Sequence, residues 1–191
     1  MRTTYIGMGA NLTSPAGPPE ATLAATATRL ESLGRVAARS SLYSTAPVGF
    51  TDQPRFVNAA AALETELTPF ELLGAVLLIE QEFGRNRISS LTNGPRTLDL
   101  DILLYGDFVV GGSSLVIPHP RLAERAFVLV PLHEIAPSAV DPRSGFTVAQ
   151  LISKFPSSVP SPGNEINAVV QIQSDLWRPV PASGAVHPGT S

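Results

Sequence analysis

Two aspartates, Asp99 and Asp101, stand two residues apart in a stretch that reads as a β-strand, directly after the turn Gly94-Pro95-Arg96. Side chains at positions i and i+2 of a strand point to the same face, with Cα atoms about 6.5 Å apart. Two carboxylates held in this way repel each other unless a cation lies between them, and one or two divalent metal ions commonly serve this purpose. The alternative is an edge strand whose aspartates are simply solvated. The pair alone does not decide between these interpretations.

The residues around the aspartates indicate where the pair would lie. Leu98, Leu100 and Ile102 form the opposite, apolar face of the strand. Leu103 and Tyr105 continue the aspartate face as apolar residues, which predicts burial on both faces beyond the carboxylates. We therefore expect the two acids at the rim of a pocket.

Arginines cluster near this strand. The chain has one lysine, Lys154, and five of its twelve arginines flank the aspartates in sequence: Arg85, Arg87, Arg96, Arg121 and Arg125. The planar guanidinium matches the geometry of phosphate oxygens, so arginines beside paired metal ligands predict a polyphosphate site. A helix ending at Gly84 would also favour cations at its C-terminus through its dipole. That alternative explains Arg85 and Arg87 but not Arg96.

Two further groups of residues could bind a ligand. Phe56 and Asn58 share one face of a predicted strand that follows the loop Thr45–Val48, and an aromatic ring beside a side-chain amide fits a flat heterocycle. A core phenylalanine beside a turn-capping asparagine is the alternative. His119 lies between two prolines, before Arg125 and Phe127, so we expect it in a loop that faces a site or solvent.

Composition bounds the class of protein. The chain has 191 residues, 43% hydrophobic and 15% charged, with a formal net charge of −3 and no cysteine. The length and composition predict one domain over residues 1–155, followed by a Pro/Ser/Gly-rich tail over 156–191. They exclude thiolate chemistry and argue against general attraction to nucleic acid. No apolar run approaches membrane-spanning length, so we expect a cytoplasmic protein with no membrane partner.

The predicted elements mix strands and helices without strict alternation, which indicates an α+β fold with a largely antiparallel sheet. Strands are expected at 3–8, 36–43, 56–65 and 99–105, with a return strand at 108–110 that pairs antiparallel after the turn Gly106-Asp107. Helices are expected from Pro18 to Gly34, from a capping box at Thr68 and Glu71 to Gly84, and within 121–135 and 147–152, interrupted by Pro131 and Pro137. The even positions of 166–173 are apolar, which is consistent with an added strand. Gly7-Met8-Gly9 follows a strand but lacks the third glycine of a dinucleotide fingerprint.

Several stretches together resemble the 6-hydroxymethyl-7,8-dihydropterin pyrophosphokinase family of folate biosynthesis. They are Tyr5–Leu12, Tyr43–Asn58, Gly94–Tyr105 and Pro118–Pro137, in family order. The resemblance implies a ferredoxin-like antiparallel sheet with helices packed on it, in a three-layer sandwich. It also implies transfer of pyrophosphate from ATP to the hydroxymethyl group of the pterin, giving AMP and the pterin diphosphate.

The resemblance further implies roles for individual residues. Asp99 and Asp101 would hold two Mg²⁺ ions that bridge the ATP phosphates, and Arg85 and Arg96 would neutralise those phosphates. The residues implied in ATP binding are Glu80, beside the adenine, and Arg87, Ile102, His119 and Arg125. Those implied in pterin binding are the rings of Phe56 and Phe127, together with Asn58 and the loop residues Thr45, Ala46, Pro47 and Val48.

One departure concerns the segment Ile88–Asn93, where the family often has a basic residue and an aromatic before Gly-Pro-Arg. This departure puts the closure over ATP in question. Two rival functions stay open at this point. The first is a catalytically silent relative that binds pterin or nucleotide, and the second is a magnesium-dependent phosphohydrolase.

Overall fold

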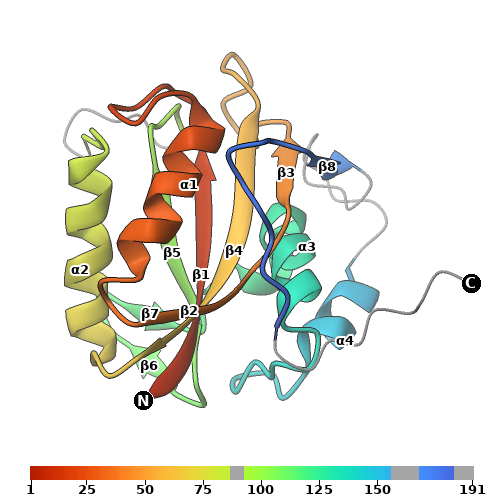
Figure 1. Cartoon of the computed structure of the whole chain (residues 1–191). Helices are drawn as coiled ribbons and strands as arrows, with labels where there is room; N and C mark the ends of the chain where they lie inside the picture. The colour runs from red at the N-terminus through yellow and green to blue at the C-terminus, as the bar shows by residue number, and fades with distance from the viewer. Residues whose placement is uncertain (87–92, 156–167, 183–191) are drawn as a thin grey trace, which may run out of the picture.

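The computed structural model describes residues 1–86, 93–155 and 168–182. A six-stranded antiparallel sheet forms the centre of the molecule (Figure 1). Five of its strands follow the order β5-β1-β4-β3-β8, and the sixth, β2, also pairs with β4. The bounds are β1 (Arg2–Ala10), β2 (Arg35–Arg39), β3 (Leu42–Thr45), β4 (Phe56–Thr65), β5 (Asp99–Tyr105) and β8 (Val170–Ile172). The helices are α1 (Pro19–Leu30), α2 (Pro69–Glu82), α3 (Ala126–Ile135) and α4 (Val148–Ser153), with a 3₁₀ turn at Leu122–Glu124.

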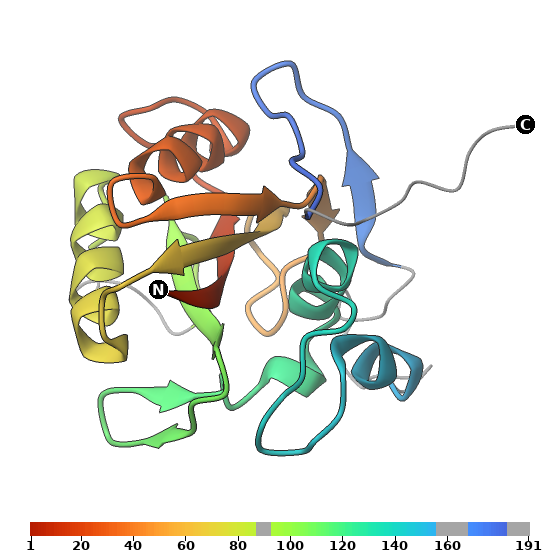
Figure 2. The same cartoon turned by 60° about the horizontal axis from the view of Figure 1, so that its bottom comes forward.

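Helices cover both faces of the sheet, as Figure 2 shows. On one face, α1 and α2 contribute Leu23, Leu72 and Val76 to a buried cluster. On the other face, α3 and α4 contribute Leu129 and Leu151 to a second cluster. The order of elements from β1 to β5 is that of a ferredoxin-like fold. The predicted α+β fold with an antiparallel sheet and packed helices is confirmed.

The best-marked elements lie where the sequence predicts them. Strand β4 spans Phe56–Thr65, and α2 begins after Thr68, whose side chain accepts a hydrogen bond from the Glu71 backbone while the Glu71 carboxylate accepts one from the Thr68 backbone. Strand β8 lies inside the predicted strand at 166–173, of which residues 166 and 167 lie outside the described part of the chain. Among the described helices, none is long and apolar enough to cross a bilayer.

Two strand predictions are wrong. The strand expected at 36–43 is two strands, because the regular ladder is interrupted at Ser40 and Ser41, two buried residues. There the Ala60 N–H donates to the Ser40 hydroxyl and not to a carbonyl, and the Ser41 hydroxyl donates to Glu134. The return strand expected at 108–110 is the short β6 (Val110–Gly111). It pairs with β7 (Val116–Ile117) in a separate two-stranded sheet, and not with β5.

Two finer predictions are also wrong: the face of the strand on which Tyr105 lies, and the interruption of a helix at Pro131. The pairing of β1 with β5 shifts register between Tyr5 and Ile6, so that Leu103 is an extra residue on β5. A bulge of this kind changes the phase of the side chains. As a result Tyr105 packs in the cluster under α1 and α2, away from the aspartate face. Pro131 does not interrupt the third helix but lies inside α3.

The capping box of α2 gives a test of the fold. Replacing Thr68 by Ala removes the acceptor at the helix N-terminus and should lower the free energy of unfolding by about 1 kcal/mol, or Tm by about 2–4 °C. Thr28→Ala is the matched control, because Thr28 is exposed in the interior of α1 and bonds only to the Ala24 carbonyl at 3.4 Å. Thermal unfolding followed by circular dichroism measures both. An equal Tm for the two variants would contradict the assigned cap.

Candidate functional site

Asp99 and Asp101 lie at the start of β5, which is an edge strand of the six-stranded sheet. On β1 their partners are Gly9 and Gly7, respectively. A Cβ atom at Gly9 would lie 3.0 Å from Oδ1 of Asn58, and one at Gly7 would lie 3.2 Å from Leu103. The glycines of the Gly7-Met8-Gly9 motif therefore allow Asn58 and Leu103 to approach β1 closely beside the aspartates.

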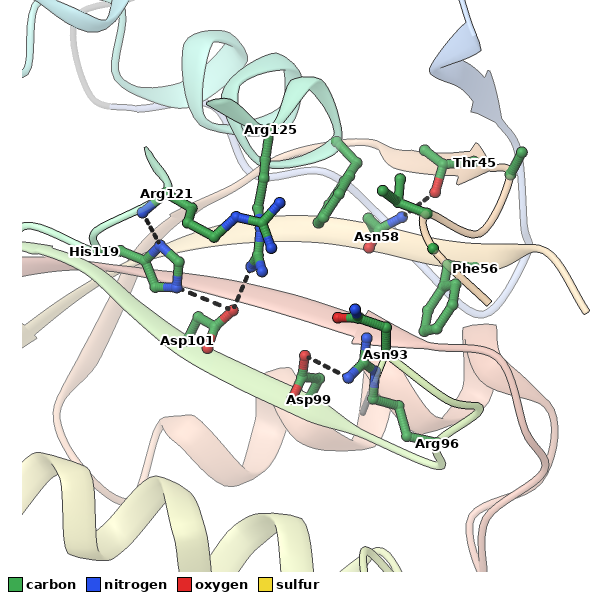
Figure 3. A pocket seen from close by; sticks show the side chains of 15 residues that line it. Thr45, Phe56, Asn58, Asn93, Arg96, Asp99, Asp101, His119, Arg121 and Arg125 are labelled. Atoms are coloured by element: carbon green, nitrogen blue, oxygen red, sulfur yellow. Dashed lines mark hydrogen bonds and ion pairs between the residues drawn. The ribbon is translucent and has the colours of Figure 1, made fainter. Parts of the chain in front are cut away.

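Four cationic or potentially cationic side chains lie close to the two carboxylates. Figure 3 shows three of them, with Arg96 beside Asp99, and His119 and Arg125 beside Asp101. Arg85 and Arg96 lie 3.6 Å from opposite oxygens of Asp99. Arg125 Nη1 and His119 Nε2 lie 3.7 and 3.9 Å from Oδ2 of Asp101. These separations exceed those of good hydrogen bonds, so the four contacts are electrostatic and leave carboxylate lone pairs available to a ligand.

Burial and the neighbouring acid both change the titration of Asp101. Burial, and then the negative charge of Asp99, raise the pKa of Asp101 to about 6, while Arg125 acts in the opposite direction. The ionised form of Asp101 is therefore less favourable here than in water, chiefly because the carboxyl group is buried. An added cation beside Asp101 would stabilise its ionised form.

His119 is neutral at physiological pH. Burial and the charge of Arg125 lower its pKa to about 4. Its Nδ1 accepts a hydrogen bond of 3.1 Å from the backbone N–H of Arg121, which assigns the ring proton to Nε2, the atom that faces Asp101. The contact between His119 and Asp101 is thus between an N–H dipole and a carboxylate, and not an ion pair.

The aromatic residues lie across the same cavity. Asn58, 6% exposed, donates from Nδ2 to Thr45 Oγ1 at 2.8 Å, and this bond joins β4 to the end of β3. The guanidinium of Arg96 lies 5.0 Å from the centre of the Phe56 ring, and that of Arg125 lies 5.6 Å from the Phe127 ring. Each of these arginines thus contacts one aspartate and one aromatic ring.

The cavity has a volume of about 400 Å³. Of the residues predicted for the site, it is lined by Thr45, Ala46, Val48, Phe56, Asn58, Arg96, Asp99, Asp101, His119, Arg125 and Phe127. Residues from four separate stretches of sequence therefore meet at one place, as the sequence predicts.

Of the remaining five predicted residues, four do not line the cavity and one is not described. Arg85 lies behind Asp99, with 9% of its side chain exposed, and Pro47 lies in the loop after β3. Glu80 is fully buried on α2 and accepts a hydrogen bond of 2.8 Å from the backbone N–H of Leu100. The side chain of Ile102 packs in the cluster under α1 and α2, so a contact with ATP would fall to its main chain. Arg87 lies outside the described residues.

Four residues that line the cavity are not among those predicted for the site: Gly9, Gly49, Asn93 and Arg121. Of these, Arg121 has a signal in the sequence, because it belongs to the arginines that flank the aspartates. Sequence reasoning gives no role to Asn11, which is 4% exposed and joins two walls of the site. The Asn11 side chain donates to Gln53 and to the Pro54 carbonyl, each at 3.0 Å, and accepts from the Arg96 backbone N–H at 2.7 Å. The signal for Asn11 is its place within the stretch Tyr5–Leu12, two residues after Gly9.

The chain is similar in sequence to known proteins. A family model described as 7,8-dihydro-6-hydroxymethylpterin-pyrophosphokinase (HPPK) matches residues 5–137. The chain is 43% identical over 155 residues to the 2-amino-4-hydroxy-6-hydroxymethyldihydropteridine pyrophosphokinase of Haemophilus influenzae, covering 81% of this chain and 94% of that protein. It is 46% identical to the protein of the same name from Pseudomonas aeruginosa, covering 72% of this chain and 82% of that one.

A solved structure also has a similar fold. The Plasmodium falciparum HPPK-DHPS structure with pteroate matches with a TM-score of 0.64 at 14% identity, over 81% of this chain. The match covers 44% of the Plasmodium chain, so the present chain corresponds to less than half of that protein. At this level of identity the likeness concerns the fold alone.

The repulsion between the aspartates predicts a pH-dependent stability of the metal-free protein. The pKa of Asp101 rises from 3.8 to about 6 on folding, so the folded protein binds the proton of the Asp101 carboxyl group more tightly than the unfolded chain does. The free energy of unfolding therefore falls as the pH rises from 3.8 to about 6. Asp101→Asn removes the charge. It should raise Tm by a few degrees at pH 7.5, and the gain should vanish below about pH 4.

Thermal unfolding in EDTA at several pH values measures this effect. Asp107→Asn is the control, because the Asp107 side chain is 89% exposed and should give no gain. Equal Tm values for the wild type and Asp101→Asn at pH 7.5 would show that the pair is not under electrostatic strain.

Proposed function

The chain belongs to the 7,8-dihydro-6-hydroxymethylpterin-pyrophosphokinase family and has its pyrophosphokinase activity in folate biosynthesis, and from this premise we propose how its own residues act. ATP and the hydroxymethyl pterin bind side by side in the cavity. ATP lies over Asp99 and Asp101, and the pterin lies between Phe56 and Phe127. A cytoplasmic location stays a prediction from the sequence.

One observation supports this proposal most strongly. The carboxylate pair and the wall made by Phe56, Asn58 and Phe127 line one and the same cavity. Arg96 and Arg125 stand between the two halves, each close to an aspartate and to a ring. A hydrolase that uses water as its acceptor has no need of the aromatic and amide wall, and a protein that binds only a pterin has no need of the acidic pair.

Two carboxylates without further protein ligands fit Mg²⁺ that is also bound by substrate phosphates, and do not fit a metal ion held by the protein alone. Among the described residues, no group of three or more His, Cys, Asp or Glu side chains could hold an ion. Mg²⁺ is commonly held by one or two carboxylates together with substrate phosphates. We therefore assign Asp99 and Asp101 as the residues that would hold two Mg²⁺ ions, which would neutralise the charge of the ATP phosphates.

In the proposed reaction, the pterin hydroxymethyl oxygen attacks the β-phosphorus of ATP in line. An oxygen–phosphorus bond forms, the bond from the β-phosphorus to the AMP oxygen breaks, and the hydroxyl proton passes to water. Transfers of this kind depend chiefly on alignment and charge stabilisation, so no strong base is assigned.

The side chains divide this work. The guanidinium groups of Arg96 and Arg125 lie where they can neutralise phosphate oxygens, and Arg85 supports Asp99 from behind. Neutral His119 offers an N–H donor to the cavity without adding positive charge. Phe56 and Phe127 hold the pterin ring flat, and Asn58 with the Thr45–Val48 loop reads its edge.

The function is tested by incubating the protein with Mg-ATP, with and without the reduced pterin alcohol, and following AMP. We expect AMP only when the pterin is present, in equal amount to the pterin diphosphate. Phosphate release without pterin would indicate a hydrolase. Binding of both ligands without turnover would indicate a silent relative, and either result would contradict the proposal.

The metal assignment has its own test. Asp101→Ala should lower kcat at least about a hundredfold, because a metal ligand is lost, while the protein stays folded. Asp107→Ala serves as the control and should turn over like the wild type, since Asp107 is exposed and outside the cavity. Near-normal kcat for Asp101→Ala at saturating magnesium would overturn the assignment.

A further inference from the structure

The described part of the tail, residues 168–182, returns to the sheet and extends it. It lies beyond the stretch that the family model matches, residues 5–137. Strand β8 pairs antiparallel with β3, with Ser44, Tyr43 and Leu42 opposite Val170, Gln171 and Ile172. Figures 1 and 2 both show β8 beside β3, at the edge of the sheet opposite to β5.

A second contact anchors the tail after β8. Trp177 is 5% exposed, belongs to the same core cluster as Leu42, and donates from Nε1 to the Ser40 carbonyl at 2.8 Å. The Arg39 guanidinium lies 5.1 Å from the Trp177 ring centre, and the backbones of Arg39 and Val180 exchange hydrogen bonds of 2.8 and 2.9 Å. The tail therefore holds the chain from Arg39 to Ser44.

A third contact connects the tail through β3 to α3. Gln171 Nε2 donates to Ser41 Oγ at 2.9 Å. Ser41 Oγ in turn donates to Glu134 at 2.9 Å, and Glu134 also accepts from the Ser41 backbone N–H and from the Tyr43 hydroxyl. Because Glu134 belongs to α3, this network fixes β3 relative to that helix.

The two elements joined by this network carry opposite walls of the pterin half of the cavity. Strand β3 ends in Thr45, one residue after the last pair with β8, and Thr45 accepts the hydrogen bond of Asn58. Helix α3 carries Phe127 in its first turn. The metal ligands Asp99 and Asp101 lie on β5, which β4 and β1 separate from β3.

We propose that the tail, through Gln171 and Trp177, is a positioning element for the pterin: it holds β3 against α3 so that Thr45 and Asn58 stand at the correct separation from Phe127. This inference rests on the proposed pterin site. Neither Gln171 nor Trp177 lines the cavity, so both act through β3. The tail should therefore affect pterin binding selectively and leave the binding of ATP and metal almost unchanged.

Gln171→Ala gives the sharpest test, because the Gln171 side chain is exposed and its loss should not unfold the protein. We expect the KM for the pterin to rise about threefold to tenfold, with kcat and the KM for ATP within about twofold of the wild type. Gln173→Ala is the matched control, since Gln173 is an exposed glutamine of the same segment whose side chain is not part of the network. It should leave all three constants unchanged.

Trp177→Ala should have the same selective effect, larger in size, provided that circular dichroism shows it folded. If it does not fold, Gln171→Ala decides alone. An unchanged pterin KM in Gln171→Ala, or an equal rise in the KM for ATP, would overturn the positioning role. A wild-type protein without pterin-dependent AMP would instead overturn the proposed function, so the two failures are distinguishable.

Discussion

The mutual repulsion of two carboxylates on one face of an edge strand is the constraint on which the site depends. Four side chains from separate elements approach Asp99 and Asp101 at 3.6 to 3.9 Å, yet the pKa of Asp101 is still raised to about 6. Burial and the nearby charge of Asp99 thus make ionisation of Asp101 costly even though arginines lie close to it. A divalent cation beside the two carboxylates would lower this cost.

The rest of the scaffold serves this arrangement. Strand β1 places glycines opposite the aspartates, and Asn11 at its end ties the turn that carries Arg96 to the loop around Gln53. On the far edge of the sheet, the tail ties β3 to α3. Partly buried hydrogen bonds made by residues outside the cavity thus support each half of it. Support of this kind keeps the geometry of a site before its ligands bind.

The sequence predicted those elements that depend on interactions between residues close together in the chain. The predicted strand Phe56–Thr65, the capping box at Thr68 and the spacing of Asp99 and Asp101 each correspond to what the structure contains. Pairing between distant segments could not be predicted in this way. The bulge at Leu103 turns Tyr105 to the other face, and Val110 pairs with Ile117 and not with β5; both depend on which partner strand is present. The order of the motifs predicted which residues belong to the site. Their exposure could be known only from the structure, as for Arg85, whose side chain beside Asp99 is 9% exposed.

The central claim is that Asp99 and Asp101 hold the metal of the ATP complex. It is tested most directly by a crystal structure with Mn²⁺, a non-hydrolysable ATP analogue and the pterin, in which anomalous scattering locates the ions. We predict two ions that are within coordination distance of the carboxylate oxygens of Asp99 and Asp101 and that also contact analogue phosphates. Ions bound to the phosphates alone, with neither aspartate among their ligands, would contradict the account.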